Sequence, residues 1–361
     1  AERDASGAAV VTWDEPASRP DVATQYALER TILGETEIMP AVTAGSELEA
    51  PPSGLTLAPV TAVESANTRA CAVAGGEVYC WGRHLIGSDA DRAPVRIAGI
   101  LEGRTVTAVS LGYSHSCAIA VGEAYCWGAN GQGQLGDGTT VNRTTPVKVV
   151  GALEGRTVTS IAAGEYRTCA IADARAYCWG EGPLGDGSLP RNPLPVAVGG
   201  ALADAEVTAI SSREATCAVA DGAAYCWGDN YLGTVGDGTT SNRSLPTPVS
   251  TAGVLAGLTV TDIVASERHT CAVAEGRVFC WGENTYGGLG DGTTTTRPVP
   301  VAVQTSGVLD GVHVESIDLG YRGTCALADE AAYCWGRNNR AQLGDGTTTD
   351  RHAPVAMTVV T

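Results

Sequence analysis

Twelve cysteines are the residues of this chain whose type and spacing point most clearly to chemistry. They fall into six pairs, and eight residues separate the two members of every pair. Paired cysteines form disulfides, bind a metal ion or remain reduced in a core. Zinc-binding cysteines usually stand about two to four residues apart in a cluster, so this wider repeated gap does not fit a metal site. We therefore expect disulfides and no bound metal, which indicates an oxidising compartment.

The spacing also predicts which cysteines pair. If residues 117–126 fold as a hairpin with Val121 and Gly122 as its turn, Cys117 lies opposite Cys126. Four of the six segments have glycine at the second turn position, where a type I′ turn needs positive φ. Opposed cysteines then occupy a non-hydrogen-bonded pair, whose Cα atoms lie about 4.5 Å apart, within disulfide range. The predicted disulfides are Cys71–Cys80, Cys117–Cys126, Cys169–Cys178, Cys217–Cys226, Cys271–Cys280 and Cys325–Cys334.

The cysteine pairs belong to a longer repeat. The tryptophan after each second cysteine recurs at intervals of 46, 52, 48, 54 and 54 residues. A β-branched run such as 106–109 precedes each hairpin, and a Gly-Asp-Gly turn with a Pro-Val strand follows most of them. Each unit thus has four strands, and a period of about 40–50 residues is typical of propeller blades. We therefore expect an all-β protein, a β-propeller of four-stranded blades.

One signature extends this interpretation to a family. Tyr-Cys-Trp-Gly-x-Asn-x-x-Gly-x-Leu-Gly-Asp-Gly-Thr-Thr, read at Tyr125 to Thr140 and again at Tyr333 to Thr348, resembles the regulator-of-chromosome-condensation repeat. The resemblance implies a propeller that usually has seven blades, and the bacterial, secreted branch often carries such cysteine pairs. Its members have unrelated activities: the founder is a nucleotide-exchange factor on chromatin, and one secreted member inhibits β-lactamases. The fold alone therefore does not choose a function.

The N-terminal segment decides the blade count. Residues 1–54 lack the repeat, and residues 55–361 hold all six copies. We favour seven blades, in which this segment forms a divergent blade, closed by pairing with Val355 to Val360 and supplying Trp13 as a seventh tryptophan. Six units without closure would leave exposed edges, which proteins avoid. The alternative is six blades with an N-terminal appendage similar to the early strands of a fibronectin type III domain.

Composition excludes several classes of partner. The formal net charge is −17 and no run of basic residues exists, so we expect no nucleic acid and no anionic membrane surface. No apolar run reaches the length of about 18–20 residues that a membrane helix needs, so we expect no membrane insertion. Without a signal peptide at Ala1, we expect the sequence to be that of a mature or trimmed chain. We expect it to be secreted, periplasmic or at the cell surface of a high-GC bacterium.

Residues that vary while their neighbours repeat are the candidates for function. One set lies just before the first cysteine of each unit, in loops between strands that should ring one face. Tyrosine, arginine and histidine recur there, and these types are favoured in binding surfaces. The candidate binding face comprises Arg69, Tyr113, His115, Tyr166, Arg167, Arg213, Arg268, His269, Tyr321 and Arg322. A second set follows Trp-Gly, at 83–84, 130, 230–231, 284–286 and 338–340. For any one of these residues, an ordinary solvated loop is the simpler interpretation.

The Gly-Asp-Gly turns favour a structural interpretation over calcium binding, because each offers one carboxylate. An arginine follows each aspartate at a nearly fixed offset, and we expect the two to make contact within each blade. The five expected pairs are Asp137–Arg143, Asp186–Arg191, Asp237–Arg243, Asp291–Arg297 and Asp345–Arg351. The repeated tryptophans should pack between blades.

No sequence motif of catalysis is present, neither Gly-x-Ser-x-Gly, a phosphate loop nor His-Glu-x-x-His. We therefore favour a module that binds a protein or a glycan and needs no cofactor. One alternative is a lyase or hydrolase with a site near the axis, built for example from His115, Glu165 and His269. Another is a structural component of an extracellular assembly.

Overall fold

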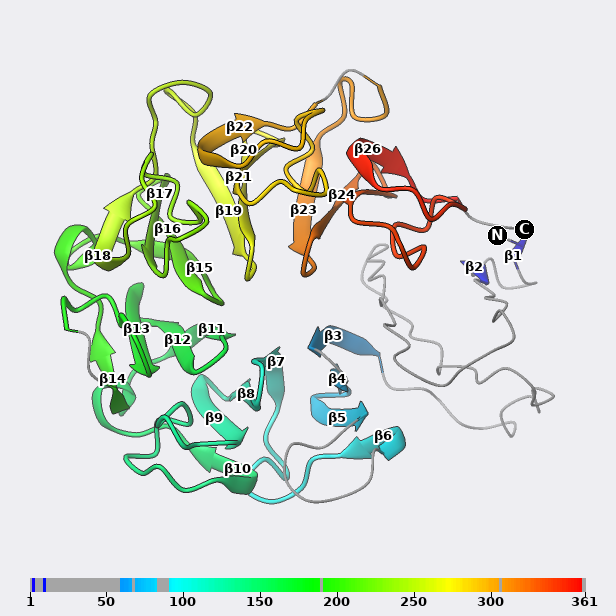
Figure 1. Ribbon diagram of the computed structural model, residues 1–361. Helices are drawn as coiled ribbons and strands as arrows, with labels where there is room; N and C mark the ends of the chain where they lie inside the picture. The colour runs from blue at the N-terminus through cyan, green and yellow to red at the C-terminus, as the bar shows by residue number, and fades with distance from the viewer. Residues whose placement is uncertain are drawn as a thin grey trace.

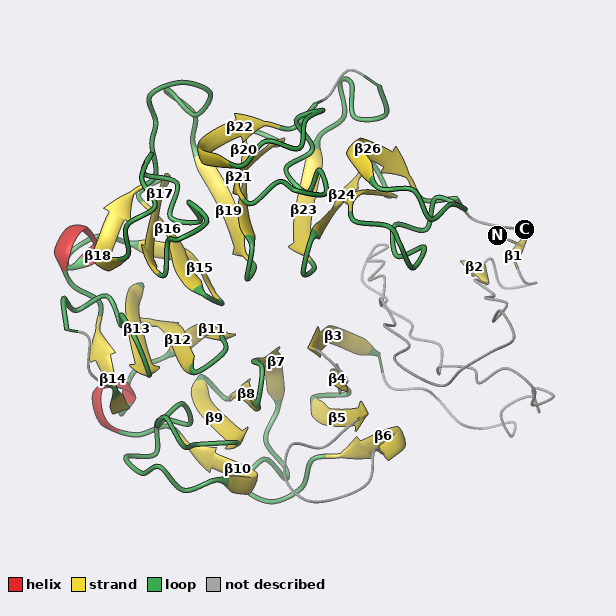
Figure 2. Ribbon diagram, in the orientation of Figure 1, coloured by secondary structure: helices red, strands yellow, loops and turns green. Residues whose placement is uncertain are grey.

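The computed structural model describes residues 2–3, 9–10, 59–66, 69–82, 91–188, 191–304 and 307–358. Six four-stranded antiparallel sheets are arranged around a common centre (Figure 1). Strands make up nearly all of the regular structure, with two short 3₁₀ turns, η1 (Gly151–Leu153) and η2 (Gly200–Leu202) (Figure 2). No helix among these residues is long and apolar enough to cross a bilayer. The prediction of an all-β propeller with four-stranded blades is confirmed.

The strands follow one another along the chain, four to a blade. Blade 1 contains β3 (Val60–Ala66), β4 (Arg69–Ala74), β5 (Glu77–Gly82) and β6 (Asp91–Arg96), and blade 2 contains β7 (Val106–Leu111), β8 (His115–Ala120), β9 (Glu123–Gly128) and β10 (Arg143–Lys148). Blade 3 contains β11 (Val158–Ala163), β12 (Arg167–Ala172), β13 (Arg175–Gly180) and β14 (Asn192–Ala197), and blade 4 contains β15 (Val207–Ser212), β16 (Ala215–Ala220), β17 (Ala223–Gly228) and β18 (Arg243–Pro248). Blade 5 contains β19 (Val260–Ala265), β20 (His269–Ala274), β21 (Arg277–Gly282) and β22 (Arg297–Ala302), and blade 6 contains β23 (Val314–Leu319), β24 (Gly323–Ala328), β25 (Ala331–Gly336) and β26 (Arg351–Ala356).

The described residues form the six blades of our alternative and not the seven that we favoured. The strand assigned to ring closure is already in use: Val355 lies opposite Cys334, so β26 is the outer strand of blade 6. At the other end of the chain, β1 (Glu2–Arg3) and β2 (Ala9–Val10) pair with each other. The rest of 1–54, including Trp13, lies outside the described residues.

The order of strands divides the connections between two faces of the ring. The first strands of successive blades contact one another in series around the centre. Because neighbouring strands are antiparallel, the connections between strands 1 and 2 and between strands 3 and 4 emerge on one face, which we call the loop face. The hairpin turns between strands 2 and 3, and the connections to the next blade, emerge on the opposite face, which we call the hairpin face.

The hairpins have the predicted register. Cys117 lies opposite Cys126, and Val121 and Gly122 both have positive φ (52° and 72°), as a type I′ turn requires. All six predicted disulfides are present, with Cα–Cα distances of 4.0–4.1 Å. Among the described residues no cysteine is free.

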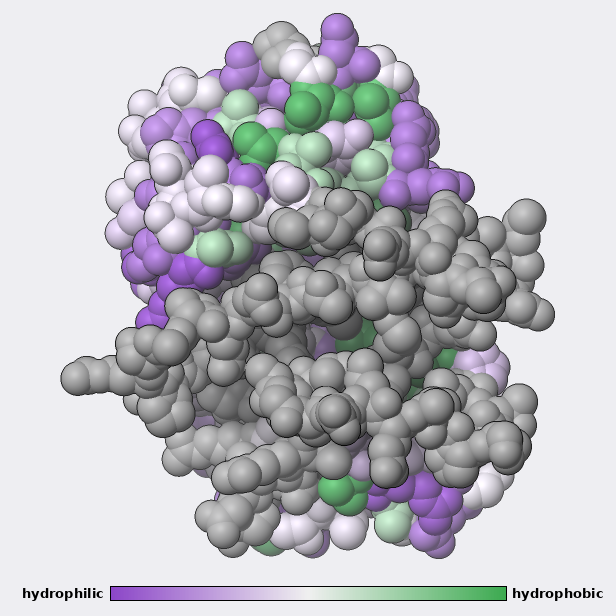
Figure 3. Space-filling view, turned by 90° about the vertical axis from the view of Figure 1, so that its right-hand side faces the viewer, coloured by the Kyte–Doolittle hydropathy of each residue, from purple (hydrophilic) through white to green (hydrophobic). Residues whose placement is uncertain are grey.

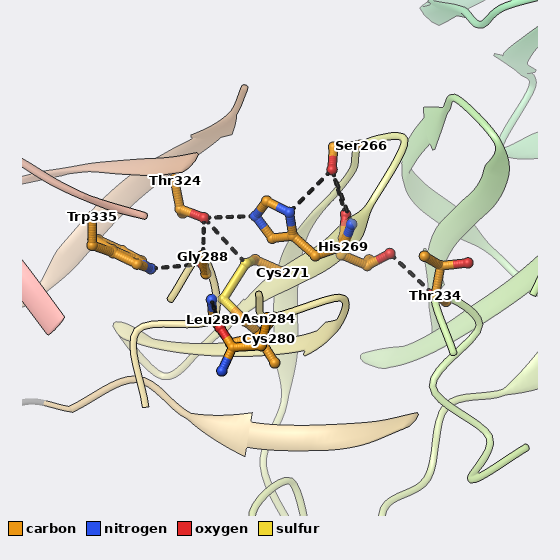
Figure 4. The surroundings of a disulfide bond; sticks show 11 residues. Thr234, Ser266, His269, Cys271, Cys280, Asn284, Gly288, Leu289, Thr324 and Trp335 are labelled. Carbon is orange, nitrogen blue, oxygen red and sulfur yellow. Dashed lines mark hydrogen bonds between the residues drawn. A yellow bond between two sulfur atoms is a disulfide. The ribbon is translucent and has the colours of Figure 1, made fainter. Parts of the chain in front are cut away.

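Hydrogen-bonded junctions of one kind join blades 2 and 3, blades 4 and 5, and blades 5 and 6, and Figure 4 shows the last of them. At the junction of blades 3 and 4, Trp227 Nε1 has no hydrogen-bond partner within the described residues. At the junction of blades 5 and 6, Trp335 Nε1 and Thr324 Oγ1 both donate to the carbonyl of Gly288, at 2.9 Å each. Because the single Thr324 hydroxyl proton is used there, Thr324 Oγ1 accepts from His269 Nε2–H at 2.8 Å. Trp179 and Trp281 donate in the same way to the carbonyls of Gln134 and Thr234. The tryptophans therefore lie between blades, as predicted.

Blade 6 differs from the middle blades on the side that faces away from blade 5. Leu327 of β24 is half-buried, whereas the equivalent Ile171 and Val219 are buried. Viewed from the right-hand side of Figure 1, the upper part of the molecule, where blade 6 lies, shows apolar surface (Figure 3).

Candidate interaction face

The loop face carries the most exposed of the predicted residues. Tyr113, Tyr166 and Tyr321 lie in the connections between strands 1 and 2 of blades 2, 3 and 6, and their side chains are 49%, 42% and 48% exposed. Large aromatic rings lose little conformational entropy on binding and bury much surface. Three such rings on one face can therefore contribute to an interface.

Three predicted residues do not reach the surface. His115, Arg167 and His269 are buried. His115 Nε2 lies 2.7 Å from Thr168 Oγ1 of the next blade, as His269 does from Thr324. Burial lowers the pKa of His115 to about 3 and that of His269 to about 4, so both imidazoles are neutral near pH 7. The two histidines join neighbouring blades, whereas Arg167 donates to the carbonyl of Pro183 within blade 3.

Two further predicted arginines lie on the axial side. Arg69 is half-buried, and its Nη2 donates to the carbonyls of Gly112 and His115, which ties blade 1 to blade 2. Burial and the nearby charge of Arg213 lower the pKa of Arg69 to about 10. On β3, burial and the charge of Asp318 raise the pKa of Glu64 to about 7. The centre of the ring therefore holds charged groups of both signs.

The structure does not assemble the acid–base set considered for an enzyme. His115 lies at the junction of blades 2 and 3 and His269 at the junction of blades 5 and 6, each hydrogen-bonded to a threonine. Within the described part of the chain, no group of three His, Cys, Asp or Glu residues is arranged to hold a metal ion.

An acidic group occupies the loop face of blades 3 and 4. The acidic group consists of Glu165, Glu181, Glu214 and Asp229, whose charges surround the buried guanidinium of Arg167. Glu214 is hydrogen-bonded to Glu165, and burial together with this bond raises the pKa of Glu214 to about 7. Four carboxyl groups against two arginines, Arg167 and Arg213, make this half of the loop face negative.

A basic and aromatic group occupies the loop face of blades 5 and 6. The guanidinium of Arg268 lies over the ring of Tyr321, and that of Arg322 lies over both Tyr321 and Tyr286. The guanidinium of Arg337 also lies over the ring of Tyr286, 5.1 Å from the ring centroid. We call Arg268, Tyr321, Arg322, Tyr286 and Arg337 the Arg–Tyr ladder. It joins loops of two blades, since Arg268 and Tyr286 belong to blade 5 and the other three to blade 6.

In five of the six repeats, all except the first with Arg83, sequence reasoning missed the residue that directly follows Trp-Gly. These positions are Ala129, Glu181, Asp229, Glu283 and Arg337. Each donates its backbone N–H to a carbonyl of the first loop in the same blade, as Glu283 does to Arg268 at 2.9 Å and Arg337 to Arg322 at 2.9 Å. The signal was available: this position changes from Ala through acid to Arg, although an invariant Gly precedes it and Asn follows it in four of these five repeats.

The second predicted set is largely structural. Asn130, Asn230, Asn284 and Asn338 are buried, and Asn338 Nδ2 donates to Asp345 Oδ1 at 3.0 Å. Tyr231 is 58% exposed on the loop face, whereas Tyr286 is half-buried in the ladder. Residues 83–84 lie outside the described residues.

The Asp–Arg contacts hold the turns of four blades. The pairs Asp137–Arg143, Asp237–Arg243, Asp291–Arg297 and Asp345–Arg351 are formed, as predicted. The prediction is wrong for Asp186–Arg191, because Arg191 donates to the carbonyl of Gly131 in blade 2 instead. Asp186 accepts from Ser188.

Comparison with known proteins adds to this geometry. Residues 33–361 match the family model of the RCC1-like domain. The chain is 30% identical over 232 residues to the ultraviolet-B receptor UVR8 of Arabidopsis thaliana, covering 62% of this chain and 51% of that protein. It is 34% identical over 119 residues to the E3 ubiquitin-protein ligase HERC2 of Homo sapiens, covering 32% of this chain and 2% of that protein. The chain thus spans about half the length, or much less, of these curated relatives.

Two solved structures share the fold. Human WBSCR16 superposes with a TM-score of 0.74 at 21% identity, covering 83% of this chain and 82% of that chain. Prp20p of Saccharomyces cerevisiae, described together with its binding to Gsp1p and histones, superposes with a TM-score of 0.70 at 19% identity, covering 83% and 77%.

Proposed function

The chain belongs to the RCC1-like domain family, and from this premise we propose that it is an interaction module that binds a protein partner through its loop face. The observation that carries the proposal is the concentration of exposed tyrosines and of the Arg–Tyr ladder on that face. Tyrosine and arginine are enriched where binding energy concentrates in protein interfaces.

The relatives support binding as the role. Prp20p, which has this fold, is described by its binding to Gsp1p and histones, and UVR8 is named a receptor. No relative supports a glycan ligand, so we propose a protein. The separation of the two buried histidines supports binding over the enzymatic alternative.

We propose that the module works outside the cytoplasm, secreted or at a cell surface. Each described blade carries one disulfide across its central hairpin. Such bonds persist in oxidising compartments and are rare where thiols are kept reduced. A bacterial, extracellular origin fits this chemistry.

Capture of a partner by matched variants tests the proposal. The loop-face variant carries Tyr113→Ala, Tyr166→Ala and Tyr321→Ala. The control variant carries Ile100→Ala, Val254→Ala and Val308→Ala, three side chains that are 41–42% exposed in connections on the hairpin face.

Immobilised wild type and control should retain the same protein from the native extracellular medium, and the loop-face variant should lose it. Loss of capture by the control, with retention by the loop-face variant, would move binding to the hairpin face and refute the proposal. Equal capture by all three proteins would refute it as well.

A further inference from the structure

The Arg–Tyr ladder has more positive charge than its surroundings neutralise. Three arginines face one carboxylate, Glu283, whose oxygens lie 3.7 Å from Arg268 Nε and 3.5 Å from Arg322 Nη2. Glu267, which directly precedes Arg268 in the same loop, reduces the local excess to one positive charge, which still contrasts with the net charge of −17 of the whole chain. The charge is therefore a local feature of this surface.

The guanidinium groups also keep unused hydrogen-bond donors. Arg268 Nη2 donates to Tyr321 Oη at 2.8 Å. The Nε atoms of Arg268, Arg322 and Arg337 are buried and find no acceptor within the described part of the chain, so the donors that a ligand can reach are the Nη groups at the ends of these side chains. Stacking on a tyrosine ring uses the face of a guanidinium, whereas its N–H donors lie in the plane at its edge. Stacked arginines therefore remain able to bind a carboxylate through two parallel hydrogen bonds.

The ladder is held in place before any partner arrives. Arg322 lies between two rings, with its guanidinium 4.9 Å from the centroid of Tyr321 and 4.8 Å from that of Tyr286. The backbone bonds from Glu283 to Arg268 and from Arg337 to Arg322 fix the two loops that carry the arginines. Fixing long side chains beforehand removes much of the entropy cost that arginine contacts carry on binding.

A water-sized hollow lies along the ladder, so a ligand would lie over it and not enter it. Its walls include Arg268, Glu283, Tyr286 and Arg322, with Gly288 among the lining residues. The surroundings limit what can lie over the ladder, because the acidic group of blades 3 and 4 shares the loop face. A long polyanion such as a nucleic acid or a sulfated polysaccharide would meet that negative half, whereas a short acidic segment would not.

We propose that the Arg–Tyr ladder binds an acidic segment of a protein partner, with aspartate or glutamate carboxylates paired to Arg268, Arg322 and Arg337. The inference rests on the proposed function and names the chemistry of the partner. The acidic half of the face then sets the orientation, since it repels the acidic segment and favours a neutral or basic stretch beside it.

The hairpin face offers a matched control. Arg104 and Arg156 lie over Tyr125 and Tyr177, each at 5.5 Å, in connections between blades. The ladder variant Arg268→Gln with Arg322→Gln and the control variant Arg104→Gln with Arg156→Gln remove the same charge from the same kind of stack. A difference between them therefore reports position and not net charge.

The probe is a rhodamine-labelled peptide in which glutamate alternates with glycine, followed by fluorescence anisotropy at low salt. We expect saturable binding to wild type, a loss of at least about tenfold in affinity for the ladder variant and less than about twofold for the control variant. Binding should also weaken as salt rises. Absence of saturable binding to wild type, or equal losses in the two variants, would overturn the inference.

Two further arms separate the alternatives. A heparin fragment or polyphosphate that competes for the ladder more strongly than the peptide would assign it to a different class of anion. In the capture assay, loss of the partner by the tyrosine variant with full retention by the ladder variant would refute the acidic-segment inference and leave the proposed function standing. Retention by both variants would refute the proposed function.

Discussion

His269 gives the sharpest test of the junctions between blades. Its imidazole is buried, donates through Nε2–H to Thr324 Oγ1, and has its pKa lowered by burial to about 4 from an ordinary value of 6.5. The unfolded chain therefore takes up a proton below pH 6.5 that the folded protein does not. A depressed pKa of this kind gives stability that is present above pH 6.5 and is lost as the pH falls toward 4.

The size of the effect follows from the shift. One pH unit corresponds to about 1.4 kcal/mol for each group that titrates in only one state. Between pH 7 and pH 5 the loss for His269 is about 2 kcal/mol of unfolding free energy. His115, whose pKa burial lowers to about 3, contributes a similar amount. Glu64 acts in the opposite direction, because its pKa is raised to about 7 and its contribution is lost as the pH rises through that value.

Comparing wild type with the His269→Gln variant isolates the contribution of this histidine to stability. His269→Gln keeps an N–H donor for Thr324 and removes the titration. We expect the variant to be less stable than wild type at pH 7, and the difference to shrink by about 2 kcal/mol at pH 5. Urea unfolding followed by tryptophan fluorescence, with the disulfides intact, measures both values. A difference that stays the same at the two pH values would refute the assignment of His269 as a buried neutral group.

Three other predictions follow from the described contacts. Asp345→Ala should lower the unfolding free energy by about 3 kcal/mol, because it leaves several donors of the turn unpaired. Asp186 makes no contact with an arginine in the described part of the chain, so Asp186→Ala should lower the unfolding free energy by only about 1 kcal/mol. Thermal or urea unfolding measures both values. Replacing both Cys271 and Cys280 by alanine should cost about 2.5 kcal/mol, the loop entropy of so short a closure, and no loss of stability would contradict the disulfide's role. The carboxyl group of Glu214 should bind a proton as the pH falls through about 7, visible in its ¹³C chemical shift, and titration near its ordinary value of 4.5 would contradict the hydrogen-bonded carboxyl pair.

Local features were predictable because they depend on turn chemistry and strand alternation. The disulfides follow from the hairpin register, and the Asp–Arg contacts from a spacing of six residues within one turn. The failure at Asp186 is also local: the loop after Trp179 is shorter, and Arg191 reaches blade 2.

Features between blades were not predictable from the repeat. His115 and His269 were assigned to the surface because they adjoin exposed loops, but each is the first residue of a strand and faces the blade junction. The Arg–Tyr ladder joins residues as far apart as 268 and 337, and only the arrangement of blades 5 and 6 brings them together. The blade count depended on residues that carry no repeat signal.

The junctions between blades have a direction along the chain. In three of them, the carbonyl that accepts from the tryptophan precedes it in sequence: Gln134 precedes Trp179, Thr234 precedes Trp281 and Gly288 precedes Trp335. During synthesis from the N-terminus, blades 3, 5 and 6 therefore each meet a carbonyl acceptor that has already been made. The same asymmetry defines the interchangeable unit for grafting or duplication, which runs from the third-to-fourth connection of one blade through the third strand of the next. A cassette cut there carries the tryptophan–carbonyl bond with it, whereas one cut at the blade boundary separates that donor from its acceptor. The histidine–threonine bond is divided in this cassette, because His269 lies on the second strand of the earlier blade.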